Sequence, residues 1–360
     1  MTLAESRVPS AIDDVTAEWL SQALRADDVA QKSLIINAIR VEQIAQDTGF
    51  SSLLYRLHLT GGPGVPSTVI VKLPAQSEAR WAMDMLGGYR RELAFYRYVA
   101  GSAPISTPHV YAAGMVEGSA DFVLVLEDLR DWDNADHLAG LSMHRARLCM
   151  EQLAGMHAWS VTAADAAALD AFPSIDTPIT RDILHPAFAL GWRVYRDKST
   201  VAVPTAVATY AERFVELAPK ALTALAVRPM LLHGDIRADN LFFDGDSLKI
   251  VDFQMASRAA GAADIAYLIS QGLPTEVRRG HDEQLVRHYL ARLADHGICD
   301  YSFDEAWRHY RFAVAYFMLL PVVSLVSWDT MPERSRALCM KLTERAVAAI
   351  DDLDATEVFE

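Results

Sequence analysis

The segment HGDIRADN, residues 233–240, contains the densest group of side chains in this sequence that could do chemistry. It holds one histidine, two aspartates, an arginine and an asparagine within eight positions. Polar and charged side chains are costly to bury without partners. The segment is therefore either a surface loop or a site where these charges act on a ligand.

Three oxygen-bearing side chains are predicted to converge at this segment. An Asp-Gly dipeptide follows it, which is a strong hairpin signal between two apolar runs. A turn centred near Asp246 would place Asn240 opposite Asp252, with their Cα atoms about 5 Å apart, and Asp235 stands shortly before Asn240. Mg²⁺ prefers hard oxygen ligands and usually completes its shell with water and substrate phosphates. The pattern predicts a magnesium site that serves a nucleoside triphosphate.

A lysine inside an apolar strand suggests a second anionic ligand. Lys72 lies in STVIVKL, which is predicted to be a strand after the turn GGPGVP. A buried lysine needs an anionic partner. A phosphate group or Glu92, on the helix predicted at residues 89–100, could supply it.

The elements that must position these residues change in type along the chain. Strands are predicted at residues 53–60, 67–73, 108–116 and 122–127, with helices at 14–26 and 89–100. Beyond residue 133 the sequence predicts helices at 141–159, 204–225, 282–296, 304–328 and 333–352, with one strand pair between them. A doubly wound fold would alternate strands and helices throughout. We therefore expect an α+β chain of two lobes.

The length of 360 residues also favours two domains. We predict a β-rich, nucleotide-binding N-lobe at residues 1–126 and a hinge at 127–132. A helical C-lobe at 133–360 would carry the catalytic loop and the acceptor pocket.

These motifs together resemble the protein-kinase-like superfamily. The similarity rests on Lys72, Glu92, the pattern HGDxxxxN at 233–240, and the DF pair at Asp252. The sequences HGD and DFQ are similar to the small-molecule branch, which includes aminoglycoside phosphotransferases, choline kinases and ecdysteroid-kinase-like proteins. The resemblance covers residues 15–330 and implies the two-lobed kinase fold.

The resemblance also implies a role for each motif residue. Asp235 would be the catalytic base that accepts or orients the substrate hydroxyl. Asn240 and Asp252 would hold Mg²⁺. Lys72 would contact the phosphates of ATP or GTP, and Glu92 would fix Lys72.

Other nucleotide-contacting positions follow from the family pattern. The glycine-rich loop of protein kinases is absent, and its equivalent would be QDTGFSS with Gly49. Glu127 and Leu129, in VLVLEDL, would contact the nucleotide at the hinge. The P-loop pattern GxxxxGK[ST] does not occur, which excludes a P-loop kinase. Gln254 replaces the flexible glycine of DFG, and the APE motif is missing, so regulation through an activation loop is not expected.

Several neighbouring residues have both structural and functional interpretations. His233 is expected to tie the catalytic loop to backbone carbonyls, and Arg237 either reaches substrate or forms a surface ion pair. Asp264 is expected to cap a helix or brace the loop, and His157 is expected to be packed in the core. The aromatic stretch 307–317 could be core or could line the acceptor pocket.

The expected function is transfer of the γ-phosphate of ATP to a hydroxyl of a small molecule. A partly apolar alcohol is favoured as acceptor, with residues 310–328 as a pocket wall. The alternative acceptor is an amino alcohol or an aminoglycoside. A nucleotide-binding pseudokinase is the alternative of another class. A metal hydrolase would lack a third ligand beside His233 and Asp235, and a protein kinase would lack the APE motif and glycine loop.

Bulk composition limits the partners and the compartment. A net charge of −14 argues against a nucleic-acid partner. Three dispersed cysteines without a CxxC pair, and an N-terminus without an apolar core, favour the cytoplasm. The apolar run 312–327 contains Pro321 and is short for a membrane span, so we expect a buried helix and no membrane partner. The sequence leaves the oligomeric state open.

Overall fold

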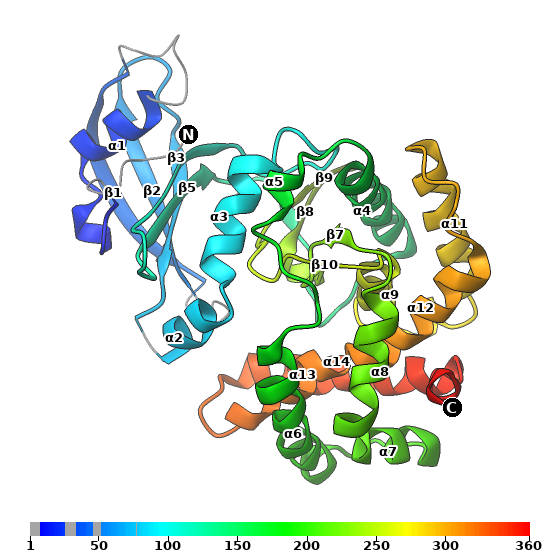
Figure 1. The fold of residues 1–360 in the computed structure, drawn as a ribbon. Coiled ribbons are helices and arrows are strands. Elements are labelled where there is room, and N and C mark those ends of the chain that lie inside the picture. Colours follow the sequence, from blue (N-terminus) through cyan, green and yellow to red (C-terminus); the bar gives the residue numbers. More distant parts are fainter. Residues whose placement is uncertain (1–7, 26–33, 46–51, 77) are drawn as a thin grey trace. The chain divides into compact units, whose positions relative to one another are not determined.

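The computed structural model describes residues 8–25, 34–45, 52–76 and 78–360, and its chain divides into two compact units (Figure 1). Unit 1 comprises Met1–Ser102, Thr107–Trp132 and Val251–Gln254. Unit 2 comprises Ala103–Ser106, Asp133–Ile250 and Met255–Glu360. The short segment Val251–Gln254 thus belongs to unit 1, whereas the sequence placed it in the range 133–360.

Unit 1 is built on a five-stranded antiparallel sheet in the order β1-β2-β3-β5-β4. Its strands are β1 (Ile36–Ile44), β2 (Ser52–Gly61), β3 (Thr68–Pro74), β4 (Val110–Met115) and β5 (Phe122–Glu127), and its helices are α1 (Ala17–Arg25), α2 (Glu78–Met85) and α3 (Gly88–Tyr98). The four predicted strands correspond to β2 to β5. The sequence did not predict β1, which carries a mixed burial pattern instead of a clear alternation.

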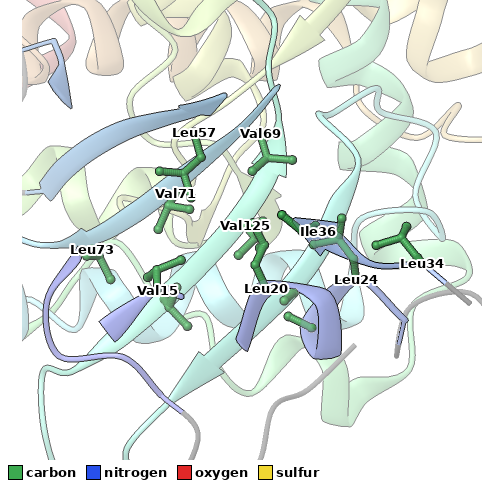
Figure 2. Packing of buried hydrophobic residues seen from close by; sticks show 13 residues of the cluster. Val15, Leu20, Leu24, Leu34, Ile36, Leu57, Val69, Val71, Leu73 and Val125 are labelled. Carbon is green, nitrogen blue, oxygen red and sulfur yellow. The ribbon is translucent and has the colours of Figure 1, made fainter. Parts of the chain in front are cut away.

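The two faces of this sheet serve different purposes. Successive side chains of a strand point to opposite faces. Val69, Val71 and Leu73 of β3 therefore share one face, where they pack with residues of α1 such as Leu20 and Leu24 in an apolar core (Figure 2). Lys72 lies between Val71 and Leu73 and points to the opposite face. This alternation explains how a lysine can stand inside an apolar run without entering the apolar core.

Unit 2 is mainly helical. Its helices are α4 (Met143–Thr162), α5 (Ala166–Leu169), α6 (His185–Lys198), α7 (Thr205–Glu212), α8 (Phe214–Leu225), α9 (Ala262–Ser270), α10 (Thr275–Arg278), α11 (Asp282–Asp295), α12 (Phe303–Tyr316), α13 (Leu319–Ser324) and α14 (Glu333–Asp352). Its short strands are β6 (Asp133–Asn134), β7 (Met230–Leu232), β8 (Leu241–Asp244), β9 (Ser247–Ile250) and β10 (Ser257–Ala259). The mixture of a β-rich unit and a helical unit confirms the predicted α+β class.

The β8–β9 hairpin differs from the prediction by one residue in register. Leu241 pairs with Ile250 and Asp244 with Ser247, so the turn is centred between Gly245 and Asp246. Gly245 takes a φ of 58°, a left-handed value that glycine adopts without strain. The ladder ends at the first of these pairs. The predicted pairing of Asn240 with Asp252 is therefore not part of it.

Two of the predicted helices are interrupted. The range 204–225 divides at Arg213, where φ is −99° and ψ is 9°. The range 304–328 becomes α12, α13 and a short 3₁₀ turn. Pro321 lies in the first turn of α13, where the amide that proline lacks would have no intrahelical acceptor.

One apolar stretch of the described chain, Phe303–Ser327, is long and apolar enough to cross a membrane by length and composition alone. In its most apolar window 67% of the residues are buried inside the structure. A core helix meets the same criteria, so the stretch is weak support for a membrane span. Its contacts with α9 and α14 are those of a packed helix.

Candidate active site

A buried ion pair connects β3 and α3 in unit 1. The Nζ atom of Lys72 lies 2.7 Å from Oε1 of Glu92 and 3.3 Å from Oδ1 of Asp252. Lys72 is 6% exposed and Glu92 1% exposed, whereas 28% of the Asp252 side chain is exposed. Three residues that the sequence analysis selected from far-apart segments therefore meet in unit 1.

The charges of this cluster stabilise one another. Burial alone would lower the pKa of Lys72, but the carboxylates of Asp252 and Glu92 outweigh it and raise the pKa above its usual range. Lys72 therefore stays cationic at neutral pH. Burial raises the pKa of Glu92, and the charge of Lys72 opposes that rise. A paired lysine of this kind presents a fixed positive charge beside the partly exposed carboxylate of Asp252.

The DFQ segment contacts α3 through its second and third residues. Asp252 has a φ of 68°, an uncommon left-handed conformation for a residue with a side chain. The ring of Phe253 stacks on Phe95, with 3.4 Å between the ring centroids and 6° between the planes. Gln254 is 3% exposed, and its Nε2 atom donates to Oε2 of Glu92 at 3.1 Å.

In unit 2, one buried carboxylate fixes the first half of the HGDIRADN segment. Asp264, in the first turn of α9, accepts hydrogen bonds from the backbone N–H groups of His233 at 2.7 Å and Gly234 at 3.0 Å. Its Oδ2 atom also lies 3.2 Å from Nε2 of His157. Asp264 is 1% exposed, so these contacts compensate for the burial of its oxygens. Asp264 braces the loop.

Glycine is required at the second position of this segment. Gly234 has a φ of 80°, and a Cβ atom there would lie 2.2 Å from the carbonyl oxygen of Met255. Any other residue would be strained by the conformation and would collide with that backbone. The backbone conformation and the close contact with Met255 therefore explain the glycine of HGD.

The second half of the segment is held from a different direction. The Nδ1 atom of His137 accepts a hydrogen bond from the backbone N–H of Ala238 at 2.7 Å, and the backbone N–H of His137 donates to Oδ1 of Asp239 at 3.1 Å. Burial lowers the pKa of His137 well below its usual value, and Arg237 and Arg345 add to the effect. The neutral ring is the form that can accept a hydrogen bond at Nδ1.

Between these anchors lies Asp235, whose side chain is 21% exposed. The hydroxyl of Tyr267 donates to its Oδ1 atom at 3.3 Å, and Nε of Arg237 lies 3.4 Å from Oδ2. The backbone N–H of Asp235 donates to Nδ1 of His233 at 3.2 Å. This bond occupies one ring nitrogen of His233, and the expected contact of the ring with backbone carbonyls stays a prediction. The carboxylate of Asp235 is thus partly exposed, as are Arg237 and Asp239, while the residues between them are buried.

Asn240 has an amide that suits metal coordination. It is 5% exposed, and its Nδ2 atom donates to the backbone carbonyl of Asp235 at 2.9 Å. This bond uses the amide nitrogen, and the oxygen is the atom of the amide that could coordinate a metal. An amide oxygen is a hard donor of the kind that Mg²⁺ takes. Asn240 belongs to unit 2 and Asp252 to unit 1.

The remaining predicted nucleotide contacts have less distinctive surroundings. Gly49 lies outside the described residues. Glu127, at the end of β5, accepts a hydrogen bond from the backbone N–H of His109 at 2.9 Å through its side chain. Leu129 is buried, and its carbonyl accepts from the N–H of Trp132. Among the described residues, no group of three or more His, Cys, Asp or Glu side chains is placed to hold a metal.

Solved structures define the class of protein to which this fold belongs. A choline kinase from Cryptosporidium parvum Iowa II has a TM-score of 0.58 over 94% of this chain and 96% of its own, at 12% identity. An ethanolamine kinase from Plasmodium vivax has a TM-score of 0.56 over 95% and 90%, at 11% identity. The GDP and kanamycin complex of the aminoglycoside phosphotransferase APH(2")-IIIa has a TM-score of 0.54 over 92% and 98%, at 15% identity. The chain has a kinase-like fold, as predicted.

The family follows from the sequence. The profile of the ecdysteroid kinase-like family matches residues 46–298, and the chain belongs to that family. An uncharacterised kinase-like protein of Caenorhabditis elegans is 24% identical over 139 residues, which is 34% of this chain and 37% of that protein. The chain therefore matches little more than a third of the length of this relative. The resemblance stated for the superfamily is confirmed.

The sequence analysis missed three residues of the site. Tyr267 and His137 bind the HGDIRADN segment from positions 32 and 101 residues away along the chain, and no local pattern marks either of them. Gln254 was noted only because it replaces the glycine of DFG. Its hydrogen bond to Glu92 required knowledge of the sheet and of α3.

Proposed function

We propose that this protein is a kinase that transfers the γ-phosphate of ATP or GTP to a hydroxyl group of a small molecule. The observation that carries the proposal is the placement of Asp235. This residue is a partly exposed carboxylate in a loop that buried side chains bind on both sides. Such placement is what a positioned general base needs, because its geometry must be fixed while its oxygens remain accessible. Membership of the ecdysteroid kinase-like family supports the same reaction.

The Lys72 cluster would bind the nucleotide. Phosphoryl transfer depends mainly on positioning and on neutralising the charge of the phosphates. Lys72 is held cationic, and Glu92 fixes its position through the 2.7 Å contact. In this proposal the ammonium group contacts phosphate oxygens. Glu127, Leu129 and Gly49 remain the predicted contacts to the rest of the nucleotide.

Asn240 and Asp252 would hold Mg²⁺. Their amide and carboxylate oxygens are ligands of the kind that magnesium accepts. Bound magnesium would supply positive charge that offsets the charge developing on the phosphates. Each of these side chains is held within its own unit, because Asn240 donates to the carbonyl of Asp235 and Asp252 accepts from Lys72.

Asp235 would act on the acceptor. The substrate oxygen forms a bond to the γ-phosphorus while the bond to the β-phosphate oxygen breaks, and the hydroxyl proton passes to the Asp235 carboxylate. The products are a phosphate ester and ADP, or GDP when GTP is the donor. The hydrogen bond from Tyr267 leaves the Oδ2 side of Asp235 to meet the hydroxyl. Arg237 is placed to offset part of the negative charge there.

The surroundings of Asp235 favour a neutral, partly apolar alcohol as acceptor. Tyr267 stacks on Phe317 with 5.7 Å between the ring centroids, which gives an aromatic wall beside the carboxylate. Arg237 places a cation 3.4 Å from the same carboxylate, which disfavours a polycationic aminoglycoside. Within the predicted wall 310–328, Tyr310 is fully buried and binds Asp282 at 2.7 Å, so it belongs to the core.

A phosphate-transfer screen tests the proposal. The purified protein would be incubated with Mg²⁺ and γ-labelled ATP or GTP, together with hydroxylated apolar compounds, amino alcohols or kanamycin-type aminoglycosides at equal concentration. Label transfer to a neutral alcohol that is lost in Asp235→Asn would support the function and the acceptor class. A clear preference for polycations would overturn the acceptor class. Nucleotide binding without transfer to any class would instead favour a pseudokinase. The cytoplasm remains the expected compartment.

A further inference from the structure

The buried amide of Gln254 completes the hydrogen bonding of Glu92. One oxygen of that carboxylate, Oε1, binds Lys72 at 2.7 Å, and the other, Oε2, accepts from Nε2 of Gln254 at 3.1 Å. A carboxylate only accepts hydrogen bonds, so the amide nitrogen must face it. Glu92 is therefore held on both sides, with Lys72 on one oxygen and Gln254 on the other.

The same amide nitrogen is anchored a second time. It donates to Oγ of Ser52, at the start of β2, over 2.9 Å. All of the atoms in these two bonds are buried. An amide with two fixed acceptors has one orientation, so Gln254 cannot turn away from Glu92 without leaving a buried carboxylate oxygen without a donor.

The backbone around Gln254 is fixed as well. A Cβ atom added at Gly88, the first residue of α3, would lie 3.3 Å from the carbonyl oxygen of Gln254. One residue earlier, the ring of Phe253 stacks on Phe95 in the same helix. The segment is thus docked onto α3 through its backbone, an aromatic ring and an amide. Asp252 is the residue immediately before this docked pair.

We propose that Gln254 is a positioning residue that acts through Glu92 on Lys72 and so sets the affinity for the nucleotide. The inference rests on the proposed function, because it concerns the same phosphate-binding lysine. By holding Oε2, the amide fixes the rotamer of Glu92 and aims Oε1 at Lys72. With the amide removed, Glu92 can rotate and Lys72 loses its fixed position.

A double-mutant cycle tests this route of action. The variants are Gln254→Met, which keeps the length of the side chain but removes the amide, Lys72→Ala, and the combination of both. We expect Gln254→Met to raise the KM and Kd for MgATP about 10-fold, the effect of losing one hydrogen bond to a charged group, with a smaller change in kcat. In the Lys72→Ala background the same substitution should change the Kd less than about twofold, because coupled residues are not additive.

Ser21→Ala serves as the matched control. The Ser21 hydroxyl accepts the backbone N–H of Ile36 at 2.9 Å and is buried. It lies on α1, and the α1 core occupies the face of the sheet opposite to Lys72. The Ser21 hydroxyl also donates to the carbonyl of Ala17 at 2.7 Å, so this variant, like Gln254→Met, loses two hydrogen bonds of unit 1. It should lower the melting temperature without raising the KM for MgATP.

Three results would overturn the inference. One is a KM for Gln254→Met within about twofold of the wild-type value. Another is an equal loss of affinity in the wild-type and Lys72→Ala backgrounds, which would show that Gln254 does not act through the lysine. The third is a rise in KM for Ser21→Ala as large as that for Gln254→Met, which would show that the higher KM results from a general loss of stability.

The design separates this inference from the proposed function. A wild-type protein that binds no MgATP or MgGTP would overturn both. A wild-type protein whose binding is weakened by Lys72→Ala, but not by Gln254→Met, would overturn the inference alone. If Gln254→Met does not fold, Gln254→Asn keeps the amide but shortens its reach, and the same rise in KM and the same lack of additivity with Lys72→Ala are expected.

Discussion

The hydroxyl group of Tyr267 donates a hydrogen bond to Oδ1 of Asp235 over 3.3 Å. Burial raises the pKa of Tyr267 well above its usual value, and the charge of Asp235 adds to the effect. The phenol therefore stays protonated and acts as a donor at neutral pH. It fixes one oxygen of the carboxylate, and in the proposed reaction the other oxygen would face the acceptor.

Removal of this hydroxyl should slow turnover without weakening nucleotide binding. Tyr267→Phe retains the ring that stacks on Phe317, so the fold should be preserved. A hydrogen bond to a charged group contributes about 1.5–3 kcal/mol, and we expect kcat to fall about 10-fold while the KM for MgATP stays constant. Steady-state kinetics at saturating acceptor measures both. An unchanged kcat would show that Tyr267 does not position Asp235.

Replacement of the proposed base should separate binding from catalysis. Asp235→Asn keeps the size of the side chain but cannot accept the hydroxyl proton. We expect turnover to fall at least ~100-fold, the scale of a lost general base, with nearly unchanged affinity for MgATP. Calorimetric titration and product formation by the folded variant test this together. Substantial retained turnover would remove Asp235 from the chemistry.

Replacement of Asp252 should remove the magnesium-dependent effect of nucleotide on stability. A ligand that binds only the native state raises the melting temperature. The wild-type protein should therefore be stabilised by ATP and Mg²⁺ together, and Asp252→Ala should not. The comparison uses thermal unfolding with ATP alone, Mg²⁺ alone and both. Equal shifts in the two proteins would exclude Asp252 from the metal site.

The buried ring of His137 should make the protein sensitive to mild acid. Its pKa is lowered in the folded state from 6.5, so the unfolded chain binds more protons below about pH 6.5. Above that pH, protonation of His137 does not reduce the free energy of unfolding. As the pH falls below it, the free energy of unfolding decreases by up to about 1.4 kcal/mol per pH unit for one group. His137→Asn offers an oxygen to the N–H of Ala238 but does not titrate.

The measurement is urea unfolding of both proteins at pH 7.5 and about pH 5.5. The variant should lose less stability between the two conditions. Burial also lowers the pKa of His185, His288 and His309, so a part of the acid sensitivity should remain. Equal losses in the two proteins would show that His137 is not responsible.

Sequence patterns identified those residues of the site that lie within a recognisable strand, helix or motif. Alternation in STVIVKL placed Lys72 on a strand, and the helical pattern that follows placed Glu92 within reach. The structure joins them at 2.7 Å. The β8–β9 hairpin was also visible, but its register was wrong by one residue. The Asp-Gly signal does not specify which two residues form the turn, and these are Gly245 and Asp246.

The supporting residues could not be found in this way, because their partners are set by packing. His137 follows a two-residue strand and binds Ala238 through a ring nitrogen. All residues of α9 are buried, so Tyr267 looks like a core residue of that helix. Only the hydrogen bond from its hydroxyl to Asp235 marks it as part of the site. The helix break at Arg213 also has no local signal, and the proline of this range, Pro219, lies inside α8 without interrupting it. Local pattern cannot supply such information.

The assignment of Val251–Gln254 to unit 1 has a consequence for biosynthesis. The ribosome completes Trp132 long before it reaches residue 251, and the intervening chain, Asp133–Ile250, belongs to the other unit. Until then the nascent sheet unit lacks the ring of Phe253 over Phe95 and the amide of Gln254 on Glu92. A domain that folds during synthesis needs its whole sequence outside the ribosome. The unit that begins to emerge first is therefore completed only after residue 254 has been made, and a fragment that stops at Trp132 should be a poor substitute for it.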